Sequence, residues 1–207
     1  MTANSSVSNT PVMVSDVEHL LKMLNQPNQC TASQISDQHA SPWGISSTGI
    51  SHEERKFFAV NFYKINKGSN EWTQPLMEPS TIPNGIVGIF YGYIKDELLV
   101  QVDIREEPGN DLLSLGPSFQ TSRHNPLYQI IEPFICLGHR RICRCDPDRY
   151  MRKENDLILT KVGKLEDFPP IGGIIVPIKV LSKVYEFHPH FVGEHLLTML
   201  GALSLGS

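Results

Sequence analysis

Two apolar runs near the middle of the chain place the strongest constraint on its fold. Residues 86–94 and 97–104 each have the length and composition of a strand, and only Lys95 and Asp96 separate them. A two-residue polar connection between two apolar strands predicts an antiparallel hairpin. The chain is therefore expected to contain an antiparallel sheet.

The two ends of the chain carry helical patterns. Apolar side chains in residues 14–24 recur on one helical face, and Ser15 and Asp16 can cap the start of that helix. Apolar side chains in residues 191–205 recur at the same spacing, with Gly201 as the one weak helix former. We expect one helix near each end.

Further strands are predicted at residues 56–65, 140–145, 156–162 and 172–178. Three prolines, at positions 75, 79 and 83, exclude residues 71–83 from regular structure and predict a loop or a sheet edge. Residues 30–51 are loop-like in composition. The predicted fold class is α+β, a mostly antiparallel mixed sheet flanked by helices. Residues 1–12 are predicted to be a flexible polar tail and residues 13–207 a single domain.

Composition excludes several classes of protein. A chain of 207 residues with 40% hydrophobic content can bury one substantial core. Its net charge of −4 and pI of about 6.0 leave no basic stripe for a nucleic acid. No segment approaches the roughly twenty apolar residues of a membrane span, and the N-terminus lacks the pattern of a secretory or transit peptide. We expect a cytoplasmic protein without nucleic-acid or membrane partners.

The cysteines raise the question of a metal site. Cys136, His139, Cys143 and Cys145 lie within ten residues, and Cys30 stands apart. Cys143 and Cys145 would share one face of a strand, whereas structural zinc ligands usually pair two to four residues apart across a turn. Without a secretory signal the cysteines are expected to be reduced. We expect strand cysteines and no metal.

A dense polar block follows the predicted hairpin. Residues 105–110 and 116–125 bring together carboxylate, guanidinium, imidazole, amide and hydroxyl groups, which suggests a functional site. The chain has no phosphate-binding glycine loop before a helix, no G-x-S-x-G and no H-E-x-x-H. Glu106 and Glu107 stand beside a proline, so they cannot supply the glutamate-bearing helix of a Nudix magnesium site.

The polar block resembles a known signature. Glu107-Pro108-Gly109-Asn110 and the stretch from Pro117 to Asn125 resemble the E-P-G-N and P-T-x-Q-x-T-R-x-N motifs of the NDP-hexose 2,3-dehydratases of deoxysugar biosynthesis. Trp72-x-Gln74-Pro75 is similar to their W-x-Q-P segment, and Ser51-His52 before Phe57 to their entry motif. The resemblance covers about residues 43–205. It implies a Nudix-like topology without the Nudix metal box.

The resemblance also carries departures. Family members contain two copies of such a module, so a single copy implies a homodimer. Arg105 stands where the family has lysine, His124 where it has serine, and Pro126 where it has tyrosine, with Tyr128 two positions further on. These changes fall where sugar and nucleotide would be held. The fold is therefore expected to transfer more securely than the substrate.

The chemistry of the family defines what the site needs. In a 4-keto-6-deoxyhexose a base removes the C3 hydrogen beside the ketone, and the C2 hydroxyl leaves with help from an acid. Neither a metal nor another cofactor is required. The acid and base candidates are Glu107, His124 and Tyr128. The candidates for contact with a small-molecule substrate, possibly a nucleotide-sugar, are Arg105, Asn110, Gln120, Ser122, Arg123, Asn125, Trp72 and Gln74.

Each candidate has a structural alternative. Glu107 can brace a turn, Asn110 can cap one, and His124 can be a solvated loop residue. His195 on the last helix is expected to be packed or partly exposed, and Trp72 to belong to a core.

Two classes of function stay open. One is a lyase acting on an activated keto-sugar or on another β-hydroxy carbonyl such as a polyketide, and the other is a non-catalytic ligand-binding module. A base and an acid facing each other across one pocket would favour the lyase.

Overall fold

The computed structural model describes residues 11–30, 33–34, 40–53, 59–78, 85–108, 110–122, 125–137, 139–145 and 155–204. Contacts divide them into two compact units. The first is drawn from residues 1–31, 86–143 and 157–207, and the second from residues 32–85 and 144–156. The predicted polar tail lies almost entirely outside the described residues, and the single-domain assignment stays a prediction.

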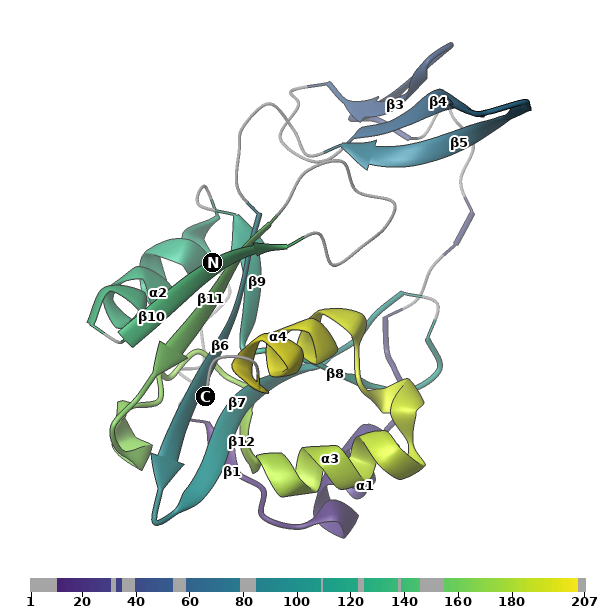
Figure 1. Cartoon of the computed structure of the whole chain (residues 1–207). Coiled ribbons are helices and arrows are strands. Elements are labelled where there is room, and N and C mark those ends of the chain that lie inside the picture. Colours follow the sequence, from purple (N-terminus) through teal and green to yellow (C-terminus); the bar gives the residue numbers. More distant parts are fainter. Residues whose placement is uncertain are drawn as a thin grey trace, which may run out of the picture. The chain divides into compact units, whose positions relative to one another are not determined.

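The first unit is built on a mixed sheet. Its described strands run in the order β1, β12, β7, β6, β11, β10, with β8 paired to β7 and β9 paired to β6 (Figure 1). Their bounds are β1 Val12–Met13, β6 Gly85–Ile94, β7 Glu97–Arg105, β8 Ser114–Pro117, β9 Phe119–Ser122, β10 His139–Cys145, β11 Asn155–Lys161 and β12 Ile174–Pro177. β1 is parallel to β12, whereas β12, β6 and β8 each pair antiparallel with β7. The predicted α+β class is confirmed.

The β6–β7 hairpin is the predicted one. Ile94 pairs with Glu97, and Lys95 and Asp96 have φ angles of 49° and 62°. Two successive left-handed residues are typical of the type I′ turn, whose twist matches that of the strands it joins. Beyond Val100 the two strands separate, and β8 takes the place of β6 beside the end of β7, where Val102 pairs with Pro117.

The helices of the first unit are α1 (Val17–Leu24), α2 (Pro126–Leu137), α3 (Ile178–Phe187) and α4 (Glu194–Ser204). α1 and α4 confirm the predicted helices, and Asp16 caps α1 by accepting a hydrogen bond from His19 N at 2.7 Å. The sequence patterns do not predict α2 or α3. Pro133 lies inside α2 and interrupts its pattern, and α3 begins at the end of a run predicted as strand.

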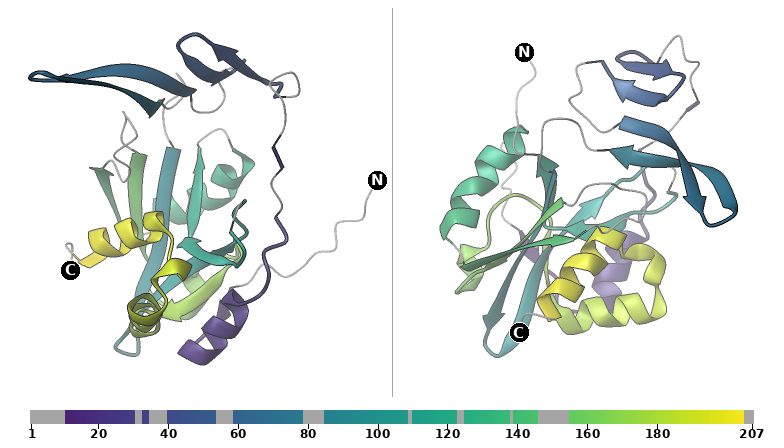
Figure 2. Two further views of the ribbon diagram at one scale, coloured as in Figure 1. Left: turned by 90° about the vertical axis from the view of Figure 1, so that its right-hand side faces the viewer. Right: turned by 45° about the horizontal axis from the view of Figure 1, so that its top comes forward.

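The sheet of the first unit lies between two helical layers. Figures 1 and 2 show α2 on one face and α1, α3 and α4 on the other. α3 contacts β12 and β7, α1 contacts α3, and α4 contacts β8. Beneath α2, Phe90 and Phe119 pack with Ile131 and Ile135 in a buried apolar cluster. Because neighbouring strand residues point to opposite faces, Gln120 points away from the cluster that holds Phe119.

The second unit contains an antiparallel sheet in the order β2 (Trp43–Ser46), β3 (Gly49–His52), β4 (Ala59–Lys67) and β5 (Asn70–Glu78). The loop-like prediction for residues 30–51 is wrong where β2 and β3 form. The exclusion of residues 71–83 from regular structure is wrong for β5, although its edge position is as predicted. Pro75 pairs with Phe62 there, and an edge strand tolerates proline because one side of it lacks a hydrogen-bonding neighbour.

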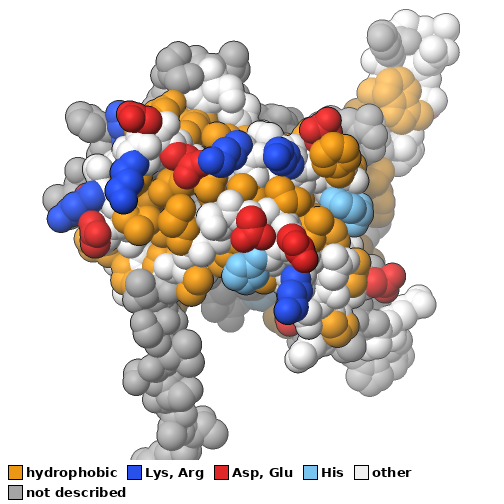
Figure 3. Space-filling model, turned by 90° about the horizontal axis from the view of Figure 1, so that it is seen from below, with side chains coloured by type: hydrophobic (Ala, Val, Ile, Leu, Met, Phe, Trp, Pro, Cys, Tyr) orange, Lys and Arg blue, Asp and Glu red, His pale blue; other side chains and the backbone are white. Residues whose placement is uncertain are grey.

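The surface agrees with the mixed charge of the sequence. On the face shown in Figure 3, Lys and Arg side chains are interspersed with Asp, Glu and apolar ones, and the coloured residues form no continuous basic stripe. Among the described helices, none combines the length and apolar character that crossing a membrane requires.

One glycine beneath α2 and one in α4 test the packing of the first unit. A Cβ added at Gly88 in β6 would fall on the ring of buried Phe119, so Gly88→Ala is expected to lower the free energy of unfolding by about 1–3 kcal/mol. At Gly201 in α4 a Cβ meets nothing within 4 Å, so Gly201→Ala is expected to raise it by about 0.5–1 kcal/mol. Urea denaturation measures both. Equal destabilisation of the two variants would contradict this packing.

Candidate functional site

The loop that follows β7 is held by a residue from the N-terminal segment. Asn110 N donates to Glu107 O at 3.1 Å, which closes a turn. The side-chain amide of Asn28 donates to Glu107 O at 2.6 Å and to Asn110 O at 2.9 Å. Asn28 N also donates to Asp111 O at 2.9 Å. Asn28 therefore fixes the backbone of the E-P-G-N turn from 79 residues away.

Arg105 lies across the neighbouring strand β8. Its Nη1 donates to Gln120 Oε1 at 2.7 Å, and its Nε donates to Asp103 Oδ2 at 3.3 Å. A Cβ at Gly116 would overlap the guanidinium, so glycine at that position lets Arg105 lie flat against the strand. The Arg105 side chain is 19% exposed, and two acceptors fix its orientation.

Burial and the Arg105 charge shift the pKa of the Asp103 carboxyl in opposite directions. Burial raises the pKa of its carboxyl above the ordinary range, and the charge and hydrogen bond of Arg105 lower it in part. The net direction is upward. Asp103 thus orients the guanidinium, while the desolvation of its carboxylate has a cost that depends on pH.

A cavity of about 330 Å³ lies beside these residues. Arg105, Glu107 and Gln120 line it from the polar block, and Glu194 and His195 line it from the start of α4. Its volume falls in the range of small-molecule sites.

The start of α4 is fixed against β8 by backbone contacts. Gly193 N donates to Leu115 O at 2.9 Å, and Leu115 forms a parallel bridge with Val192. Two segments that are distant in the sequence therefore bring a carboxylate and an imidazole to one cavity.

His195 lines the cavity although no sequence motif points to it. It is half-buried, in agreement with the expectation that it is packed or partly exposed. The helical spacing of Leu196, Met199 and Leu203 identifies the buried stripe of α4 and leaves His195 beside it. That spacing does not indicate which cavity His195 lines. The bridge between Val192 and Leu115 joins the start of α4 to β8, where the cavity lies.

Other predicted site residues lie elsewhere in the first unit. Tyr128, on α2, packs against the apolar cluster beneath that helix and does not line the cavity. Asn125 Oδ1 accepts a hydrogen bond from Leu127 N at 2.9 Å, which caps α2. Asn110 Nδ2 lies 3.4 Å from Glu107 Oε2. Arg123 and His124 lie outside the described residues, as does the side chain of Ser122. The roles predicted for these residues stay predictions.

The tryptophan motif belongs to the second unit. Trp72 and Gln74 lie two positions apart on β5 and so share a face, and Trp72 Nε1 donates to Gln74 Oε1 at 3.2 Å. The Trp72 side chain is 42% exposed, so it is not the core residue that the structural alternative describes. The W-x-Q spacing puts the two side chains on the same face of the strand, where this hydrogen bond can form.

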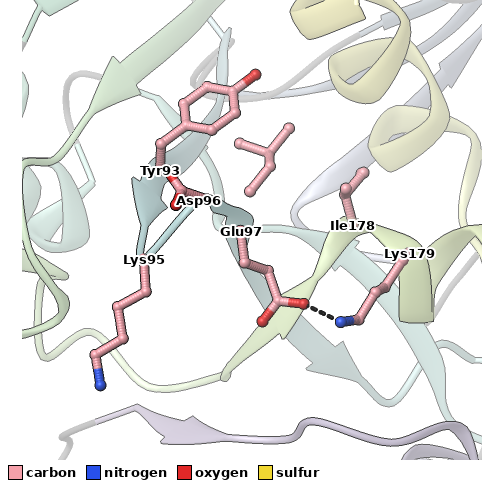
Figure 4. Close-up of a pocket in the computed structure, with 7 residues that line it drawn as sticks. Tyr93, Lys95, Asp96, Glu97, Ile178 and Lys179 are labelled. Carbon is pink, nitrogen blue, oxygen red and sulfur yellow. Dashed lines mark ion pairs between the residues drawn. The ribbon is translucent and has the colours of Figure 1, made fainter.

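A larger groove lies at the β6–β7 turn. Figure 4 shows Tyr93, Lys95, Asp96 and Glu97 from the hairpin opposite Ile178 and Lys179 from α3. Its volume is about 710 Å³, but Glu97 and Lys179 form an ion pair within it and it contains no residue of the signature. Size alone would favour this groove, whereas the chemistry favours the smaller cavity.

Most of the candidate metal ligands lie outside the described side chains. Among the described residues no cluster of three His, Cys, Asp or Glu side chains could hold a metal ion. Cys30 is a free thiol. The side chains of Cys136, His139, Cys143 and Cys145 lie outside the description.

The fold and the cavity define an α+β protein with a polar site of small-molecule size. A sequence model of the family described as NDP-hexose 2,3-dehydratase matches residues 14–130, more than half of the chain. The chain therefore belongs to that family, and the resemblance seen in its motifs is confirmed. No curated protein sequence matches it. The match includes Arg105, Glu107 and Gln120, and His195 lies beyond its end.

The raised pKa of Asp103 gives a pH-dependent prediction. As the pH rises above about 3.9, the ordinary aspartate pKa, the unfolded chain releases this proton before the folded chain does. Asp103 therefore makes the free energy of unfolding fall with pH until its raised folded pKa is passed. Asp103→Asn keeps an acceptor for Arg105 and removes that fall.

The unfolding free energy of Asp103→Asn minus that of the wild type should rise with pH through the acidic range and then level off. Urea denaturation at several pH values measures it. A difference that falls with pH would contradict the assignment.

Proposed function

We propose that the chain is a hydro-lyase that removes water from an NDP-activated 4-keto-6-deoxyhexose in deoxysugar or natural-product biosynthesis. One observation carries the proposal: two residues of the family signature, Glu107 and Gln120, line a single cavity together with the neighbouring Arg105. The family provides the class of substrate. The Nudix-like topology, the homodimer and the cytoplasmic location stay predictions.

The cavity offers the groups that this reaction needs. The C3 hydrogen of a 4-keto sugar is acidic because its removal gives an enolate conjugated with the C4 oxygen. A carboxylate is a suitable base for this proton, and Glu107 lines the cavity. Gln120 Oε1 accepts from Arg105, which leaves its amide nitrogen as a donor toward a carbonyl or enolate oxygen.

The same cavity bears on the non-catalytic alternative. A module that only binds needs a guanidinium and amide donors, which Arg105 and Gln120 provide. Glu107 and His195 add two groups capable of proton transfer, from two separate segments of the chain. This arrangement supports a lyase over a binding module. The sugar-nucleotide family supports a keto-sugar over a polyketide as the substrate.

Exchange of the C3 hydrogen tests the proposal. The protein is incubated with a dTDP-4-keto-6-deoxyhexose in deuterated water and followed by NMR and mass spectrometry, which report C3 deuteration and loss of water. Glu107→Gln keeps the size of the side chain and removes the base, so both rates should fall about 100-fold or more.

Glu106→Gln is the matched control for this variant. Glu106 is the adjacent exposed glutamate and does not line the cavity, so its replacement should leave both rates unchanged. A wild-type protein that neither exchanges the C3 hydrogen nor releases water would contradict the proposed substrate. An unimpaired Glu107→Gln variant would contradict the proposed base.

A further inference from the structure

We propose that His195 is the proton donor to the leaving C2 hydroxyl, acting across the cavity from Glu107. The assignment rests on the proposed function and adds a residue that lies beyond the matched part of the chain. It gives the two halves of the elimination to two different segments, the β7 loop and the start of α4.

Backbone and core contacts fix the turn of α4 that carries His195. The bond from Gly193 N to Leu115 O fixes the backbone two residues before it. On the following turns, Leu196 and Met199 are fully buried and hold α4 against the unit. His195 therefore reaches the cavity from a rigid helix end, as a proton-transfer group requires.

Glu107 is anchored independently of α4. The two hydrogen bonds from the Asn28 amide hold the backbone on both sides of the E-P-G-N turn. The two candidate groups thus come to one cavity of about 330 Å³ from two separately anchored segments of backbone.

His195 suits the role of donor better than its neighbour. Glu194 also lines the cavity, but it lies in the first turn of α4, where a carboxylate interacts favourably with the helix dipole. A histidine can hold a releasable proton as imidazolium near neutral pH and becomes neutral imidazole when it gives that proton up, whereas a carboxylate is ordinarily ionised there and only accepts. The division of roles follows: Glu107 accepts the C3 proton and His195 gives one up.

The step balances without any further reactant. Glu107 takes the proton from C3, and the C–H electron pair forms the enolate of the C4 ketone. The enolate then expels the C2 oxygen as the C2–O bond breaks, and the proton from His195 turns it into water. The product is an enol with a C2–C3 double bond, which tautomerises to a 3,4-diketo-2-deoxy sugar. Transfer of the proton from Glu107 through solvent restores both groups.

The test separates proton abstraction from loss of water. His195→Gln keeps an N–H but cannot transfer its proton, and His195→Ala removes the group. In deuterated water with a dTDP-4-keto-6-deoxyhexose, both variants should continue to exchange the C3 hydrogen, while their release of water should fall about 100-fold or more. Thermal unfolding of each variant monitors the structural contribution of the side chain.

His190→Gln is the matched control. His190 is an exposed histidine five positions earlier, and it does not line this cavity. Its replacement should leave both exchange and water release at the wild-type rates.

The outcomes separate this assignment from the proposed function. A wild-type protein inert in exchange and in elimination would overturn the proposed function, and this assignment with it. With an active wild type, His195→Gln that releases water at the wild-type rate would overturn the assignment alone. A folded His195→Gln that loses exchange and water release equally would also overturn it, because His195 would then act in the first step.

Discussion

The buried hydroxyl of Ser118 holds together the place where the central hairpin opens. It donates to Gln101 O and accepts from Phe90 N, so it bonds both β7 and β6 at the point where they separate. Ser118 lies between β8 and β9, so its hydroxyl ties the junction of those two strands to the opened hairpin. Gly116 and Gln120, which lie against the Arg105 guanidinium, stand two residues on either side of Ser118.

Where β6 and β7 separate, β9 has one face toward the apolar core and the other toward the polar cavity. Phe119 faces α2 and completes an apolar cluster, and the next residue, Gln120, faces the cavity beside α4. A short strand inserted into a sheet can thus serve a core on one face and a polar site on the other. Tyr128 falls on the core side of this division, and His195 falls on the cavity side.

Local signals predicted the parts of the fold that local chemistry determines. The two-residue connection fixed the hairpin, and the Asp16 cap marked α1. Proline was a misleading signal where the structure tolerates it: Pro75 lies in an edge strand, and Pro133 lies within α2. Glu107 and Gln120 were found because each belongs to a recognisable motif, and Arg105 because it stands two positions before the first of them. Asn28 and His195 were missed because only tertiary contacts bring them to that motif.

The central claim is that the cavity between the polar block and α4 receives the hexose of a nucleotide-sugar. A crystal structure of the Glu107→Gln variant soaked with a dTDP-4-keto-6-deoxyhexose tests it most directly. The account predicts the hexose ring in that cavity, with its keto oxygen at Gln120 and its C3 facing residue 107. A hexose ordered in the groove at the β6–β7 turn, or at any place away from Arg105 and Gln120, would contradict it.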